Sequence, residues 1–164
     1  MQKKILHLSK KLIINLPIFM DVAVDTLSNF TTLEAKKTSH EIREFDANLD
    51  GIFISASMKF KGDINGSFVL IFPREIAIIT LEAILSEKVD ANDFDTLKDG
   101  VGEFCNIVLG SIKTAFSKKD INITFALPQT YSSLKSIKGS IGTEKGIWVN
   151  MSLSKKPFYM FIGT

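Results

Sequence analysis

Two apolar runs in the middle of the chain constrain the fold more than any other feature. Residues 51–60 (GIFISASMKF) and 64–72 (INGSFVLIF) are rich in β-branched and aromatic side chains, and a turn signal at 61–63 (KGD) separates them. This pattern predicts a β-hairpin. Pro73 follows directly and suits the first turn of a helix, because its missing N–H would have no partner there.

Helical and strand-like segments surround this hairpin. We predict helices from Pro17 to Phe30, from Pro73 to about Lys88 and from about Asn92 to Lys118, with further strands at 121–126, 146–153 and 157–162. Residues 132–140 fit either a strand or a loop. The expected fold class is α/β (α+β), a two-layer arrangement of helices packed on a mostly antiparallel sheet. A chain of 164 residues without a linker is one domain, which we place at residues 15–164 after an N-terminal extension, residues 1–14, of unassigned role.

Composition excludes several kinds of site. The 20 basic and 18 acidic residues are too balanced for a protein that binds nucleic acid. One cysteine and 2 histidines leave no basis for a disulfide framework or a thiolate zinc site, so we expect no metal ion held by the protein itself. No run reaches the roughly 18 apolar residues of a membrane helix. Lys10 and Lys11 interrupt the one stretch that could resemble a signal peptide, and we expect a cytoplasmic protein.

The third predicted helix contains the candidate site. At about 100° per residue, one side collects apolar residues that would face the core, namely Phe94, Leu97, Val101, Phe104, Cys105, Val108, Ile112, Ala115 and Phe116. The opposite side contains Asp99, Glu103, Asn106 and Gly110. Spacings of four and three residues make Asp99, Glu103 and Asn106 neighbours on the helix surface.

Two features of this face are unusual for a helix surface that only meets water. Gly102 and Gly110 lie on or beside it, although each glycine inside a helix costs about 0.5–1 kcal/mol relative to alanine. Close approach of another molecule would explain them. A carboxylate and a carboxamide also stand side by side with little lysine or arginine between them. On this pattern alone, an ordinary solvated helix face stays open as the alternative.

The same residues resemble the motif of the CheX/CheC family of chemotaxis phosphatases. The chain reads Asp99-x-x-x-Glu103-x-x-Asn106, with Pro128 further on. The string GEFCNIVLGSIK (102–113) is similar to the family's Gly-Glu-x-x-Asn segment with its following apolar residues.

The resemblance extends over most of the chain, from about residue 15 to the C-terminus. Residues 15–19 are similar to the start of the family's first helix, and residues 61–73 to its stretch that ends in Phe-Pro. The first predicted helix has no Glu-x-x-Asn of its own, so the chain is similar to the CheX type with one motif copy. The resemblance implies a CheC/CheX-like fold and a homodimer.

The resemblance also implies an activity, hydrolysis of the aspartyl phosphate on a CheY-like response regulator in chemotaxis or two-component signalling. Phosphoryl transfer needs positioning more than covalent chemistry, and the Asn106 carboxamide can hold a water in line because it offers both a donor and an acceptor. By resemblance, Glu103 pairs with a lysine of the regulator's active site, and Asp99, Gly102 and Gly110 support the docking face. Mg²⁺ would belong to the phosphorylated receiver domain, and no cofactor of the protein's own is implied.

Two other functions stay open. One is a non-catalytic CheX-like binding or adaptor module for a response regulator or another signalling partner. The other is a membrane-surface protein that uses the basic and apolar residues 1–14. A frayed or dimer-packing extension accounts better for that segment, so we do not expect a membrane partner.

Overall fold

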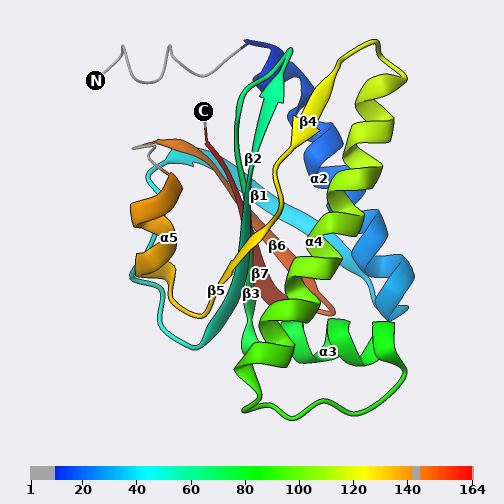
Figure 1. Ribbon diagram of the computed structural model, residues 1–164, viewed down its shortest axis with the longest axis vertical. Helices are drawn as coiled ribbons and strands as arrows, with labels where there is room; N and C mark the ends of the chain where they lie inside the picture. The colour runs from blue at the N-terminus through cyan, green and yellow to red at the C-terminus, as the bar shows by residue number, and fades with distance from the viewer. Residues whose placement is uncertain (1–9, 142–144, 164) are drawn as a thin grey trace.

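The computed structural model describes residues 10–141 and 145–163. Its elements in chain order are α2 (Lys10–Thr31), β1 (Ala35–Arg43), β2 (Phe53–Gly62), β3 (Gly66–Pro73), α3 (Arg74–Leu85), α4 (Phe94–Ser117), β4 (Ile123–Phe125), β5 (Gln129–Tyr131), α5 (Leu134–Ile141), β6 (Gly146–Leu153) and β7 (Lys156–Gly163). Figure 1 shows α2, α3 and α4 on one face of the sheet and α5 on the other. The α+β class with helices on an antiparallel sheet is confirmed.

The sheet has the strand order β1-β6-β7-β3-β2-β4, and β5 pairs with β2 beside β4. Every pairing is antiparallel. The predicted hairpin is β2–β3, in register from Phe60 opposite Gly66 to Phe53 opposite Pro73. α3 follows directly at Arg74, with Pro73 as its N-cap residue, and ends at Leu85 rather than near Lys88.

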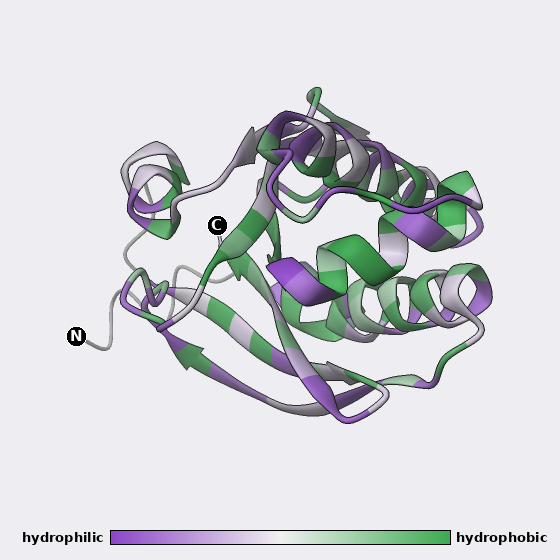
Figure 2. Ribbon diagram, turned by 90° about the horizontal axis from the view of Figure 1, so that it is seen from below, coloured by the Kyte–Doolittle hydropathy of each residue, from purple (hydrophilic) through white to green (hydrophobic). Residues whose placement is uncertain are grey.

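Strand alternation divides the buried side chains between two cores. On β3, Phe68, Leu70 and Phe72 face the helices, whereas Val69 and Ile71 face a smaller core under α5. Figure 2 shows hydrophobic residues in both the helices and the strands of the sheet, and the buried ones form the main core between these two layers. The main core positions α4, because buried residues of this helix pack on α2 and on the sheet and leave its other side outward.

The first helix begins earlier than predicted. α2 starts at Lys10, so Pro17 lies inside the helix and not in its first turn. Pro17 has no N–H to bond the carbonyl oxygen four residues earlier. Burial of Leu12, which is fully enclosed in the core, favours the helix upstream of the proline. The helix therefore crosses the expected boundary between residues 14 and 15, and residues 1–9 of the extension lie outside the described residues.

α2 is also a candidate membrane span by length and composition, with a mean hydropathy of 1.3 in its most apolar window. Within the described residues, no other helix meets this test. However, 44% of that window is buried inside the domain. Six of its apolar residues are buried in the main core, as in the core helix of a globular domain, namely Leu12, Leu16, Phe19, Met20, Ala23 and Leu27. Ile13, Ile14 and Phe30 are exposed.

Three short or polar elements differ from the predictions. Strand β1 has eight exposed residues after its first, so no apolar alternation marks it in the sequence. β5 has three residues. Residues 132–140, expected to be strand or loop, mostly form α5, an eight-residue helix that buries Leu134, Ile137 and Ile141.

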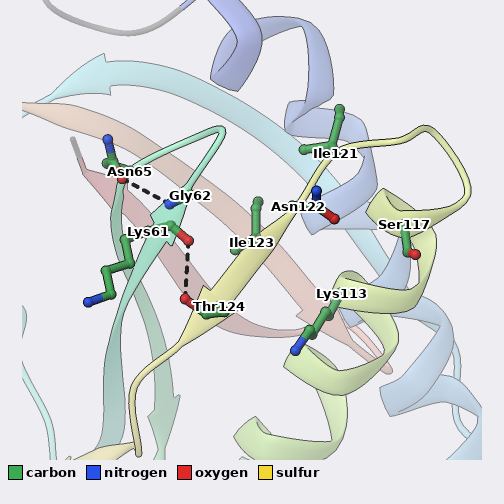
Figure 3. A pocket seen from close by; sticks show the side chains of 9 residues that line it. All are labelled: Lys61, Gly62, Asn65, Lys113, Ser117, Ile121, Asn122, Ile123 and Thr124. Atoms are coloured by element: carbon green, nitrogen blue, oxygen red, sulfur yellow. Dashed lines mark hydrogen bonds between the residues drawn. The ribbon is translucent and has the colours of Figure 1, made fainter.

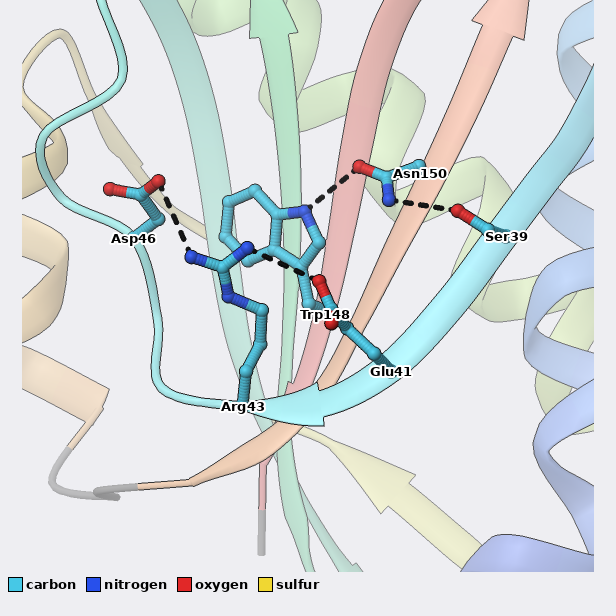
Figure 4. A network of polar contacts seen from close by, with 6 residues as sticks. All are labelled: Ser39, Glu41, Arg43, Asp46, Trp148 and Asn150. Carbon is cyan, nitrogen blue, oxygen red and sulfur yellow. Dashed lines mark hydrogen bonds and ion pairs between the residues drawn. The ribbon is translucent and has the colours of Figure 1, made fainter.

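A polar cluster holds β1 against β6 on the face opposite the main core (Figure 4). The Trp148 indole N–H donates to Asn150 Oδ1 at 3.1 Å, and Asn150 Nδ2 donates to Ser39 Oγ at 3.0 Å. The Arg43 guanidinium lies 5.4 Å from the centre of the Trp148 ring and pairs with Asp46 at 3.6 Å. Such cation–π and hydrogen-bond contacts, together with strand pairing, keep a polar strand in the sheet without apolar alternation.

Candidate functional site

Local sequence and burial together place the candidate site on α4. The helix begins after Asp93, whose carboxylate accepts hydrogen bonds from the Thr96 hydroxyl at 2.7 Å and the Thr96 backbone N–H at 3.1 Å. These two bonds lower the pKa of Asp93. From this capped start the helix continues to Ser117, with its apolar face on the core as predicted and Ala115 partly buried.

Four predicted site residues are exposed on the outer face of α4. They are Asp99, Glu103, Asn106 and Gly110. Within the described part of the chain, the side chains of Asp99, Glu103 and Asn106 have no hydrogen bond or ion pair. Their donors and acceptors are therefore available to another molecule.

Asn106 lies at the edge of a groove of about 590 Å³ between α2 and the C-terminal half of α4. Ile18 lines it from α2, and Asn106, Ile107, Gly110, Ser111, Thr114, Ala115, Lys118 and Lys119 line it from α4 and its end. Sequence analysis did not identify this groove, because the packing of α2 against α4 creates it. Periodicity on α4 could have pointed to Thr114 and Lys118, but no sequence signal links Ile18 to them.

The structure corrects the placement of Gly102. This residue is buried, and a Cβ there would lie 3.0 Å from Thr130 Cγ2 of β5. The lack of a side chain at position 102 therefore allows α4 to pack closely on β5. Gly102 is not part of the exposed face of α4 that was predicted to dock a partner. In contrast, a Cβ at Gly110 would meet no atom within 4 Å. Packing inside the protein therefore gives no reason for a glycine at position 110.

This contrast predicts opposite effects of Gly110→Ala on stability and on partner recognition. The variant should raise the free energy of unfolding by about 0.5–1 kcal/mol, because alanine favours a helix over glycine. It should weaken binding and turnover if a partner approaches this point of α4. Chemical denaturation and a binding assay measure the two effects.

Gly139→Ala on α5 is the matched control, since its Cβ also would meet no atom within 4 Å. It should stabilise the protein and leave binding unchanged. Wild-type binding and turnover by Gly110→Ala would show that no partner lies close to Gly110.

Cys105 does not contribute a nucleophile. It is fully buried in the main core, and desolvation raises the pKa of its thiol to about 12. A thiol with this pKa remains protonated near neutral pH, and the thiolate is the reactive form. Cys105 is therefore not part of the exposed face of α4.

A second hollow, of about 620 Å³, lies between the C-terminal part of α4 and β4 (Figure 3). Its lining includes Lys61, Lys113 and Asn122 but none of the predicted site residues. In this view the side chain of Lys61 points away from Lys113. Residues 10–141 and 145–163 contain no cluster of three or more His, Cys, Asp or Glu side chains that could hold a metal ion.

Comparison with known proteins supports the expected family. A family model described as "Chemotaxis phosphatase CheX" matches residues 54–151, a span that contains α4 with Glu103 and Asn106 as well as Pro128. No curated protein matches the chain in sequence.

Solved structures share the fold at low sequence identity. The chemotaxis protein CheX from Vibrio vulnificus is 19% identical, with a TM-score of 0.71 over 89% of this chain and 95% of that one. CheX in a CheX–CheY–BeF₃–Mg²⁺ complex from Borrelia burgdorferi is 19% identical, with a TM-score of 0.69 over 90% and 96%. A FliM–SpeE complex from H. pylori also matches, at 15% identity and a TM-score of 0.69 over 96% and 89%.

The family model covers more than half of the chain. The structure has a CheC/CheX-like fold in which the side of α4 with Glu103 and Asn106 faces outward. The chain therefore belongs to the CheX family of chemotaxis phosphatases.

Proposed function

We propose that this protein hydrolyses the aspartyl phosphate of a CheY-like response regulator in chemotaxis signalling. The observation that supports it most is the exposed pair Glu103 and Asn106, one helical turn apart and without partners among the described residues. The pair lies within the segment that matches the CheX family model. The proposal places the protein in the cytoplasm, where a phosphorylated response regulator acts.

Asn106 would act on water. An acyl phosphate has a good leaving group, so the missing element is a nucleophile held in line with the bond that breaks. The Asn106 carboxamide can accept a hydrogen bond from that water through Oδ1 and donate one to it through Nδ2. The water oxygen attacks phosphorus, the bond to the aspartyl oxygen breaks, and the products are the free carboxylate and inorganic phosphate. The water's protons pass to phosphate and solvent.

Glu103 would dock the helix. Its carboxylate is exposed and lies three residues before Asn106, which places both side chains in reach of one site on a partner. A lysine beside the phosphorylated aspartate would form a charge-assisted pair with it. The solved Borrelia complex contains CheX together with CheY, BeF₃ and Mg²⁺. By analogy, we propose that Mg²⁺ belongs to the receiver domain and that this protein holds no metal of its own.

The decisive experiment measures phosphate loss from phosphorylated receiver domains of the same genome, with and without the protein. Faster loss from at least one receiver supports the proposal. An unchanged rate with every receiver contradicts it.

A binding or adaptor module is the second candidate function. The observation in its favour is that the same fold occurs in the FliM–SpeE complex, so the fold alone does not specify a phosphatase. Direct binding to a receiver without faster phosphate loss would support this function.

We propose a homodimer on the basis of the single Glu-x-x-Asn copy and the family resemblance. The need to cover the edge strand β1 gives the homodimer little support. β1 already has charged side chains and a register shift between Lys37 and Ser39, and such features discourage pairing with another strand. Sedimentation at micromolar concentration should show a dimer. A monomer under those conditions would contradict the proposal.

A further inference from the structure

The exposed face of α4 is divided by charge at Asn106. Its N-terminal half contains Asp95, Asp99 and Glu103. Lys98 is the basic residue of that half, and it pairs with Asp95 at 3.7 Å. Residues 104–117 contain no acidic residue, and Lys113 lies in this part. Lys118 and Lys119 follow at the end of the helix.

Helix geometry aligns Asp99 and Lys113 with the proposed catalytic residue. Asp99, Asn106 and Lys113 are spaced seven residues apart, so they share one face. Asp99 and Lys113 each lie about 10 Å along the axis from Asn106, in opposite directions. Lys118 is about 18 Å away along the axis and about 120° around it, on the side of α2, where it lines the same groove as Asn106. The groove thus connects Asn106 with a basic end.

Interactions inside the protein account for only part of this arrangement. Across the described residues, Glu103, Lys113 and Lys118 form no ion pair. The helix dipole favours a cation at Lys118, which is the C-cap residue of α4. Its effect is limited to the first and last turns, and both Glu103 and Lys113 lie outside those turns. Acidic residues four apart, as in 95, 99 and 103, also repel each other slightly.

We propose that Lys113 and Lys118 dock against an acidic surface of the receiver domain, on the side of its phosphorylated aspartate opposite to the lysine that Glu103 meets. This inference rests on the proposed function and adds the orientation and selectivity of docking. A receiver turned end for end along α4 would face like charges at both ends, which opposes binding in that orientation. Receivers without acidic residues at that place would be poor substrates.

The test is the double variant Lys113→Glu/Lys118→Glu, assayed on a phosphorylated receiver that the wild type accepts. KM and the direct Kd should rise by about tenfold or more, whereas kcat at saturation should stay within about twofold, because neither lysine reaches the phosphate. Lys113→Gln/Lys118→Gln should give a smaller rise in KM. Raised salt should weaken binding less in the double variants than in the wild type.

Lys135→Glu/Lys138→Glu on α5 is the matched control. Both lysines are exposed and change the net charge equally, but α5 covers the opposite face of the sheet. This control should leave KM near the wild-type value. A charge-reversal experiment on the receiver completes the test. In each receiver variant, two neighbouring acidic surface residues are changed to lysine, and one of these variants should bind Lys113→Glu/Lys118→Glu tightly again.

Three outcomes would overturn the inference: an unchanged KM and Kd in Lys113→Glu/Lys118→Glu, an equal rise in the α5 control, or a fall in kcat without a change in KM. With an active wild type, they leave the proposed function intact. If the wild type binds a receiver but releases no phosphate, the phosphatase proposal fails and the Kd comparison still decides the docking inference. If it binds no receiver, both fail.

Discussion

Asn106→Ala is expected to lower the rate of phosphate loss by about 100-fold or more, with receiver binding nearly unchanged. The side chain is proposed to hold the attacking water, and loss of such positioning costs about this factor. The defect should therefore appear in the chemical step rather than in KM. Single-turnover phosphate loss and direct binding to the same receiver separate the two quantities.

Asn106→Ala should leave the fold intact. Asn106 is exposed and has no hydrogen bond to another described residue, so the free energy of unfolding should change by no more than about 0.5 kcal/mol. Asn29→Ala is the matched control, because Asn29 is an exposed helical asparagine on α2. It should keep the wild-type rate. Wild-type turnover by Asn106→Ala would remove Asn106 from the mechanism and favour the adaptor function.

Glu103→Gln is expected to weaken both binding and turnover. The substitution keeps the size of the side chain and removes the charge proposed to pair with a lysine of the receiver. Loss of one partner of a partly desolvated charge pair costs about 2 kcal/mol, so kcat/KM should fall by about 30-fold. Raised salt should mimic part of this defect in the wild type and should affect Glu103→Gln less.

Glu34→Gln is the control for Glu103→Gln. The Glu34 side chain is 79% exposed, lies 3.9 Å from Lys36, and belongs to the connection between α2 and β1 and not to α4. It should have no effect on binding. Equal effects of both variants would show a response to net charge alone, and wild-type binding by Glu103→Gln would exclude the proposed lysine pair.

Sequence periodicity was informative where an element has one buried side. The β2–β3 hairpin alternates over two runs of apolar residues, and α4 has an apolar face interrupted by polar positions at helical spacing. The same periodicity placed Asp99, Glu103, Asn106 and Gly110 on the outer side, as the structure shows. The fold class and the exposed part of the site were therefore predictable from local patterns.

Elements that depend on contacts with distant segments of the chain were not predictable from local periodicity. β1 is a polar strand that pairing with β6 and contacts around Trp148 hold in the sheet. α2 continues upstream of Pro17 with Leu12 buried by the rest of the domain. Such burial favours a helix where local propensity predicts its end.

Spacing within single segments was sufficient to predict the hairpin, α4 and the outward direction of Glu103 and Asn106. The difference between the two glycines depends on packing between segments, because Gly102 lies against Thr130 of β5 whereas Gly110 faces open space. Packing between segments also created the groove that joins Asn106 to Lys118, by bringing Ile18 of α2 against α4. These features arise from contacts between segments distant in the chain, and periodicity within a helix contains no information about what packs on it.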